Sequence, residues 1–418
     1  MINKMIANEV IESLRKGIPP RRGINLYSVG HEKLIEGIKR FHIEQIGDVG
    51  KIRFVSGSWG SGKTHFFRLL CDLAFKNNCL VSNVELSVND APFNKFEKVF
   101  YGIIRNVSTP ADFENKVTNA APFSGIIQET LTKLGGVGAI EEISHELYTK
   151  ACEKLMANKS IDIDFKKIIL EYWKTYLPDS AEITTLEVQR EELMQWFSGE
   201  GALGAYRKKY TVSKMVTREN AKLMLQSLGE FVKITGYNGL IILFDEAEQS
   251  YSVMRKSALR DAHNNLLSLI NSIESLPGMF LIYATTPDFY TDPKHGIVSY
   301  GALSGRIGKP EDHPPKALET VWNLDSVVHK LEDYQNVAKK IRIIYKEAYV
   351  IEENGIACED DLVKFVTELN KMHPSLSAVN FWRVMVASTV KYLDNEIEGE
   401  ASPIEIVYHD VMDQLRED

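Results

Sequence analysis

The strongest chemical pattern in the sequence is a glycine-rich run that ends in lysine and threonine. It consists of Gly57, Ser58, Trp59, Gly60, Ser61, Gly62, Lys63 and Thr64, and it fits the P-loop pattern G-x-x-x-x-G-K-S/T at every fixed position. Glycines let backbone N–H groups approach phosphate oxygens, the lysine places a cation on the β- and γ-phosphates, and the threonine hydroxyl can bind Mg²⁺. An apolar stretch at 52–56 precedes the run, and helical spacing follows it at 64–75. This order favours a nucleotide site over an ordinary turn.

A second candidate is an apolar run that ends in two carboxylates. Residues 240–244 are all apolar, and Asp245 and Glu246 follow them. Such a run is typical of a central parallel strand that presents charge at its carboxyl end. Beside a P-loop it indicates a Walker B motif, in which Asp245 holds Mg²⁺ through water and Glu246 orients or deprotonates the attacking water. Without the P-loop, the same run would more often be a strand-end turn. The pair favours hydrolysis over simple nucleotide binding.

Periodicity also predicts the elements that carry these residues. Further strands are expected at 80–86, 279–284 and 321–324, and helices at 3–16, 32–41, 217–234 and 257–274. The patterns between 108 and 235 are mainly helical, and this stretch is too long for a normal crossover, so we expect a helical insertion there. The predicted domains are an N-terminal helical lead-in at 1–50, a core at 51–325 interrupted at about 108–235, and a C-terminal helical lid at 326–418.

The composition is that of an ordinary globular protein, with 44% hydrophobic and 25% charged residues in 418. A net charge of −8 argues against nonspecific coating of nucleic acid, although a local basic face stays open. The four cysteines are scattered without metal-ligand spacing, which predicts reduced thiols and no structural metal. No stretch resembles a signal peptide or reaches the roughly 18 apolar residues of a membrane span, so we expect a cytoplasmic protein without a membrane partner.

Taken in order, these motifs resemble the ATP-binding proteins of BREX phage-defence loci (BrxD-like), a branch near the origin-recognition (Orc/Cdc-type) AAA+ ATPases. The stretches that carry the resemblance are Leu14–Pro20, Val29–Glu32, Arg53–Thr64, Val84–Ser87, Trp196–Glu200, Gly236–Leu240, Asp245–Glu248, Ala284–Pro287 and Ala302–Arg306. The P-loop alone is unspecific, whereas the ordered set covers most of residues 10–310. The resemblance implies an α/β P-loop NTPase fold of AAA+ type, with a parallel sheet, helices on both faces, a helical insertion and a C-terminal helical lid.

The resemblance also implies roles for two short segments beside the nucleotide. Val29 and Gly30, which turn just upstream of the P-loop strand, are expected to contact the adenine ring; the alternative is a turn that packs under the sheet. Thr285 or Thr286 is expected to act as a polar sensor near the γ-phosphate. The alternative for these threonines is a capped strand end.

Two arginines stand where AAA+ ATPases place arginines that act on the nucleotide. Arg306 would be a finger that reaches a neighbouring subunit's nucleotide, which requires an ATP-dependent homo-oligomer. Arg383 would be a second sensor at the start of a lid helix. Either residue could instead be an ordinary surface arginine.

The implied function is ATP hydrolysis, with ATP and Mg²⁺ as cofactors, in a nucleotide-dependent switch or loader that acts on a partner helicase, another defence-system protein or DNA. A second hypothesis is a signalling scaffold that binds ATP without turnover and holds a partner protein through its helical insertion. A small-molecule kinase fits the large insertion and lid less well. The basic segment at 206–210, flanked by tyrosines, could bind DNA without sequence specificity or could be a solvated face.

Overall fold

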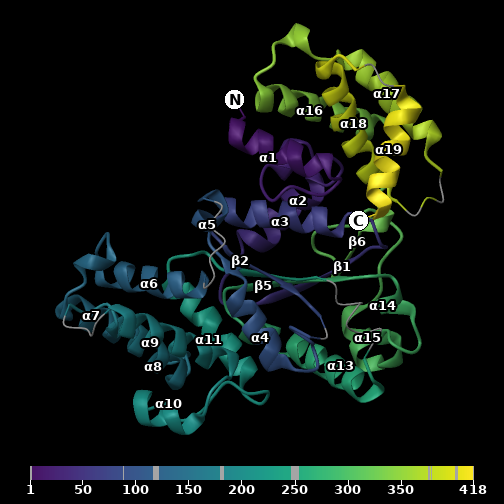
Figure 1. The fold of residues 1–418 in the computed structure, drawn as a ribbon. Coiled ribbons are helices and arrows are strands. Elements are labelled where there is room, and N and C mark those ends of the chain that lie inside the picture. Colours follow the sequence, from purple (N-terminus) through teal and green to yellow (C-terminus); the bar gives the residue numbers. More distant parts are fainter. Residues whose placement is uncertain are drawn as a thin grey trace. The chain divides into compact units, whose positions relative to one another are not determined.

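The computed structural model describes residues 2–87, 89–115, 122–178, 183–245, 254–374, 377, 379–400 and 403–417. The chain divides into two compact units (Figure 1). The first, which we call the P-loop unit, comprises Met1–Lys39, Ser56–Leu73 and Glu311–Asp418. The second, the strand unit, comprises Arg40–Val55 and Ala74–Pro310.

The strands form a six-stranded, mostly parallel sheet in the order β3-β2-β4-β5-β1-β6. Their bounds are β1 Lys51–Ser56, β2 Leu80–Glu85, β3 Val107–Ser108, β4 Leu240–Asp245, β5 Met279–Thr285 and β6 Val321–Asn323. Five of them confirm strands expected from the sequence. The two-residue β3, which pairs antiparallel with β2, was not expected because so short a run has no readable alternation. The protein is therefore a mixed α/β structure.

The middle of the sheet is apolar because it is covered on both faces. All seven residues of β5 are buried, and so are the first five residues of β4. β2, β4 and β5 run parallel, with Glu85 of β2 opposite Asp245 of β4 in the register. A parallel sheet brings the carboxyl ends of its strands to one edge, so this register places two carboxylates side by side.

Between β3 and β4 the described residues form helices, as the sequence predicts for the insertion. After α4 (Phe96–Arg105) come α5 Pro110–Asn115, α6 Pro122–Gly135, α7 His145–Ala157, α8 Ile163–Lys174, α9 Ile183–Gln195, α10 Leu203–Tyr210 and α11 Ala221–Ile234. Their aromatic side chains build a core of their own: Phe165 and Phe123 pack against Phe197 and Phe231. The buried indole of Trp173 donates a hydrogen bond of 2.7 Å to the carbonyl of Ile127, which ties α8 to α6.

The C-terminal helices form the main core of the P-loop unit. Their bounds are α16 Leu331–Tyr349, α17 Glu359–Met372, α18 Phe381–Glu398 and α19 Ile404–Glu417, with α1 Lys4–Arg15 from the N-terminus. The apolar face of α1, formed by Ala7, Val10, Ile11 and Leu14, is buried against α16 and α18. Arg15 reinforces this contact with an ion pair of 2.8 Å to Asp394. The first and last segments of the chain thus share one hydrophobic core.

The remaining helices lie next to the candidate site residues. They are α2 Glu32–Ile38, followed by a π-helical turn at Lys39–Ile43, α3 Lys63–Lys76, α13 Lys256–Asn271, α14 Asp288–Thr291 and α15 Gly301–Ile307. Helices α1, α2, α3, α11 and α13 confirm expected helices to within a few residues. None of the helices in the described ranges is both long and apolar enough to cross a membrane.

Candidate functional site

The P-loop is shaped by glycines at positions where another residue would not fit. A Cβ on Gly57 would collide with the Oγ of Ser61, because the loop folds back onto its own first residue. Gly60 and Gly62 have φ angles of +78° and +94°, in the left-handed region that side chains disfavour. α3 begins at Lys63, and the N–H of Phe66 bonds the carbonyl of Gly62 at 2.8 Å. The backbone is therefore wound tightly around the N-terminus of α3.

Lys63 points back into this loop. Its ammonium donates to the carbonyl of Gly57 at 2.7 Å and to that of Ser58 at 3.2 Å, and it lies 5.5 Å from the ring of Trp59. Only 9% of Lys63 is exposed, whereas 68% of Trp59 is. The lysine is thus oriented by main-chain oxygens, with its charge held at the loop where phosphate oxygens would bind.

Two hydroxyls of the P-loop also suit a ligand that carries phosphate groups. The Oγ of Ser61 is buried and has no hydrogen-bond partner among the residues that the structure describes. Thr64 is exposed in the first turn of α3. Together with the helix N-terminus and the Lys63 ammonium, these groups suit a polyphosphate, because each offers a donor or a positive charge. The threonine oxygen suits Mg²⁺, which prefers oxygen ligands.

The predicted adenine segment lies between α3 and the segment that leads into α16. Gly30 has φ +86°, and a Cβ there would lie 3.0 Å from the ring of His329. Val29 packs against the core of the C-terminal helices. Next to them, the ring of His31 is 5.6 Å from Phe66 and 6.3 Å from His329. The structure thus places Val29 and Gly30 beside α3, as an adenine contact requires, while that contact itself stays a prediction.

Three histidines in this region have pKa values below the usual one for histidine. Burial, followed by the charge of His329, lowers the pKa of His31 to about 4. Burial, followed by the charges of His31 and His329, lowers the pKa of His65 to about 3. Burial also lowers the pKa of His329. The Nε2 of His65 lies 2.8 Å from the Oγ of Ser28, so a neutral ring shares one hydrogen bond there.

Arg383 donates a hydrogen bond to a residue outside the P-loop. Its Nε donates to the carbonyl of Gly17 at 3.2 Å, in the turn after α1. The lid residue that lies against the loop is instead Asn380, the N-cap of α18: a Cβ on Gly60 would be 3.1 Å from its Cβ. The sensor role of Arg383 remains a prediction. Asn380 could not be found from the sequence, because an N-cap asparagine is common and carries no sign of what it touches.

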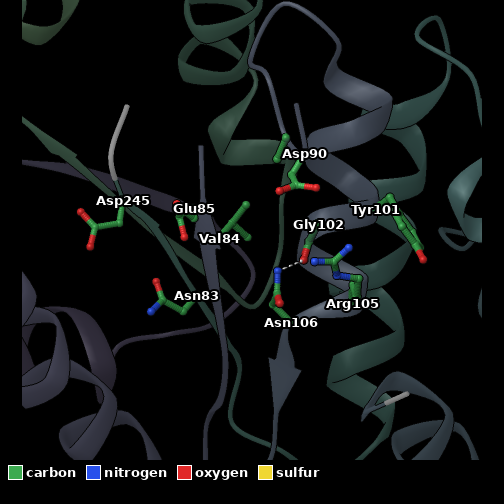
Figure 2. Close-up of a pocket in the computed structure, with 10 residues that line it drawn as sticks. Asn83, Val84, Glu85, Asp90, Tyr101, Gly102, Arg105, Asn106 and Asp245 are labelled. Carbon is green, nitrogen blue, oxygen red and sulfur yellow. Dashed lines mark hydrogen bonds between the residues drawn. The ribbon is translucent and has the colours of Figure 1, made fainter. Parts of the chain in front are cut away.

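In the strand unit, Asp245 opens onto a polar cavity of about 240 Å³ (Figure 2). Glu85 lines the same cavity from the end of β2, as the register of the two strands requires. Asp90 and Arg105 also line it, which gives three carboxylates and one guanidinium. Glu85 was not expected from the sequence, although a strand that ends in a carboxylate was a readable signal. Glu246, the predicted general base, lies outside the described residues.

The threonine pair at the end of β5 has unequal surroundings. Thr285 is fully buried; its hydroxyl donates to the carbonyl of Val55 at 2.9 Å and is hydrogen-bonded to the Tyr290 hydroxyl at 2.9 Å. Burial raises the pKa of that tyrosine. Thr285 thus ties β5 to the strand that leads into the P-loop. Because the Thr285 hydroxyl is already hydrogen-bonded, Thr286 is the remaining sensor candidate. Its sensor role stays a prediction.

Two basic groups complete the set of predicted residues. Arg306 is exposed on the last turn of α15, a position from which its side chain can reach another molecule. In α10 the basic residues 207–209 are exposed, but Tyr206 and Tyr210 are only 3% and 2% exposed. Both tyrosine hydroxyls bond Glu192, which also pairs with Lys209. The tyrosines are therefore core residues, and stacking of these rings on nucleic-acid bases is excluded in this arrangement.

The strand, the glycine-shaped loop and the helix N-terminus with its buried lysine form an arrangement that suits a protein that binds the phosphates of a nucleotide. The chain belongs to the family of BREX system ATP-binding proteins BrxC/D, which it matches over residues 2–402. No curated protein and no solved structure matches it. Membership implies ATP binding and a role in phage defence, and it agrees with the resemblance stated from the motifs.

Proposed function

We propose that the protein is an AAA+-type ATPase with a P-loop NTPase fold that hydrolyses ATP as part of phage defence. The observation that carries this proposal is the P-loop itself, where Lys63 is held by the carbonyls of Gly57 and Ser58 at the N-terminus of α3. A buried cation at the N-terminus of a helix suits the β- and γ-phosphates of a nucleotide. Membership of a family of ATP-binding proteins indicates that this nucleotide is ATP.

The roles of the residues follow from their chemical types. Lys63 would bind the phosphate oxygens, and Thr64 and Asp245 would hold Mg²⁺, Asp245 through water. Glu246 would orient the attacking water and accept its proton. Mg²⁺ would neutralise the charge that develops on the phosphate oxygens. Thr286, Arg306 and Arg383 are proposed as groups that sense or stabilise the γ-phosphate.

The proposed output of this chemistry is a conformational switch. The lid and the P-loop belong to one compact unit, so a change at the loop is passed to the helices that pack with it. We propose that the two nucleotide states differ in their affinity for a helicase, another protein of the defence system or DNA in the cytoplasm. The competing proposal is a scaffold that stays bound to ATP and holds its partner through helices α5 to α11.

Steady-state ATP hydrolysis by the purified chain, alone and with single- or double-stranded DNA, tests the proposal. The key variant is Glu246→Gln, with Glu187→Gln on the exposed face of α9 as the matched control. We expect Glu246→Gln to abolish turnover while ATP binding persists, and Glu187→Gln to behave as the wild type. ATP binding without turnover under every condition would contradict the ATPase proposal and leave the scaffold. Stimulation by DNA would support a loader.

The oligomer is tested through Arg306. We expect light scattering to show a larger species with ATP than without it in the Glu246→Gln background, where the nucleotide is retained. In the otherwise wild-type chain, Arg306→Ala should reduce hydrolysis without reducing ATP binding by the monomer. A monomer in both nucleotide states would exclude a finger that acts between subunits.

A further inference from the structure

A carboxylate from the segment that leads into the lid holds the first residues of the P-loop. The backbone N–H of Ser58 donates to Asp325, at 2.9 Å from Oδ2 and 3.1 Å from Oδ1, and the Ser58 hydroxyl donates to Oδ2 at 2.8 Å. Hydrogen bonds to an ionised acceptor are about twice as strong as neutral ones. Asp325 lies in the 3₁₀ turn Leu324–Ser326, which follows β6 and precedes α16. The bonds therefore connect the loop to the start of the lid.

The turn that presents Asp325 is fixed in place by its neighbours. The ring of Trp322, fully buried on β6, packs edge-on against Phe66 of α3 at 6.0 Å. The side chain of Asn323 accepts from the N–H of Asp325 at 3.2 Å and donates to the carbonyl of Glu311 at 2.8 Å. The carboxylate is exposed, but its backbone is not free to move away from the loop.

The Ser58 residue transmits this constraint to the lysine. Its carbonyl accepts from the Lys63 ammonium at 3.2 Å and from the N–H of Ser61 at 3.1 Å. Because peptide groups are planar and Ser58 is bonded at its N–H, its hydroxyl and its carbonyl, rotation of the residue would break bonds on both sides at once. Asp325 therefore helps to orient the carbonyl that positions Lys63.

The lid meets the loop at a second point. Asn380, whose Oδ1 accepts from the N–H of Trp382 at 2.8 Å to cap α18, lies against the α-carbon of Gly60. Asn380 is thus fixed by its own helix, as Asp325 is fixed by its own turn. The segment that enters the lid and the start of α18 thus contact the loop two residues apart, at Ser58 and at Gly60.

We propose that Asp325 is a positioning residue for the P-loop: it fixes Ser58, and through Ser58 the Lys63 ammonium, so that nucleotide affinity depends on docking of the segment that enters the lid. This inference rests on the proposed function, since it concerns the same nucleotide site. Asp325 acts through Ser58 and makes no contact with nucleotide. Its loss reduces affinity because Lys63 then has to be ordered when the nucleotide binds.

The test compares Asp325→Ala and Asp325→Asn with Glu319→Gln. Glu319 is the matched control, because its carboxylate accepts from the backbone N–H of Lys316 at 3.0 Å in the same unit without touching the P-loop. Binding of a fluorescent ATP analogue with Mg²⁺, kcat and KM for ATP, and the unfolding midpoint are measured for each. We expect Asp325→Ala to raise Kd and KM about tenfold, since one charged hydrogen-bond contact is of that order. Asp325→Asn keeps one acceptor oxygen, so its Kd and KM should lie between those of the wild type and Asp325→Ala. The unfolding midpoint of each variant should be near that of the wild type.

A double-mutant cycle with Ser58→Ala separates positioning from a general structural role. Because Asp325 binds both the hydroxyl and the N–H of Ser58, the two substitutions should be less than additive in Kd. Unchanged Kd in Asp325→Ala, tighter binding, or a loss matched by Glu319→Gln would overturn the inference. If the wild type itself does not bind the analogue, the proposed function fails; if it binds and Asp325→Ala binds equally well, only the positioning role fails.

Discussion

The P-loop and the acidic ends of β2 and β4 are held in opposite ways. In the P-loop, contacts come from all sides: Lys63 bonds two carbonyls, Ser58 bonds Asp325, and Gly60 touches Asn380. At the strand ends, Glu85 and Asp245 are brought together by sheet register and line an open polar cavity (Figure 2). One region concentrates donors and positive charge, and the other concentrates acceptors.

This difference separates the expected effects of substitution. A change in the P-loop alters both the groups proposed to bind phosphate and the shape of the loop, so it should act first on affinity. A change at the strand ends leaves the sheet intact, because the register depends on buried apolar neighbours such as Leu243 and Ile282. It should therefore act on turnover. Substitutions in each region test this division between affinity and turnover.

The largest effect is expected for Lys63→Ala. Removing the ammonium takes away the cation that we propose binds the β- and γ-phosphates, and we expect kcat/KM for ATP to fall about 10³-fold. Steady-state hydrolysis and equilibrium binding measure it, with Lys76→Ala as a control at the exposed end of the same helix. Equal losses in the two variants would mean that the helix, and not the ammonium, matters.

Asp245→Asn should lower turnover while sparing affinity. The change removes a charge that would hold Mg²⁺ through water but keeps the volume and the strand, so we expect kcat to fall about 100-fold with Kd nearly unchanged. The half-exposed Asp261→Asn on α13, which pairs with Arg218 away from the cavity, serves as the control. A large loss of ATP binding in Asp245→Asn would break the division between the two regions.

Gly57→Ala should weaken ATP binding about tenfold. The added methyl group collides with the Oγ of Ser61, and overpacking of this kind costs about 1–3 kcal/mol. Gly204→Ala is the matched control, since no atom lies within 4 Å of a Cβ at that position. Binding assays together with the unfolding midpoint distinguish a local change in the loop from unfolding. Unchanged affinity in Gly57→Ala would show that the loop adapts.

The last expected effect is a pH dependence of stability on the P-loop side. The folded pKa of His65, about 3, lies below the usual value near 6.5, so the unfolded chain binds more protons between these values. Stability therefore falls as pH drops below 6.5, by about 2 kcal/mol at pH 5 from this one group. Urea unfolding at pH 7.5 and 5.0 should show a smaller fall for His65→Gln than for the wild type. The exposed His409→Gln should match the wild type, and an equal fall in all three would refute the assignment to His65.

Much of the fold and the core of the site could be predicted from local patterns. Short apolar runs bounded by polar residues gave β1, β2, β4, β5 and β6, and helical periodicity gave α1, α3 and α11. The P-loop was readable because its glycines serve backbone conformation locally, as the positive φ angles of Gly60 and Gly62 confirm. The strand β3 was missed because it exists only through its pairing with β2.

The sequence by itself determined which residues could bind a phosphate and which strand ends carry charge, since both depend on neighbours within about ten positions. Only the tertiary structure decided what holds them. It placed Asp325 on Ser58 across 267 positions, set Asn380 against Gly60, and buried the tyrosines of α10 that could otherwise have stacked on bases. Such contacts depend on how buried faces pack against each other, as the rings of Trp322 and Phe66 do. A one-dimensional pattern does not specify which distant surfaces meet.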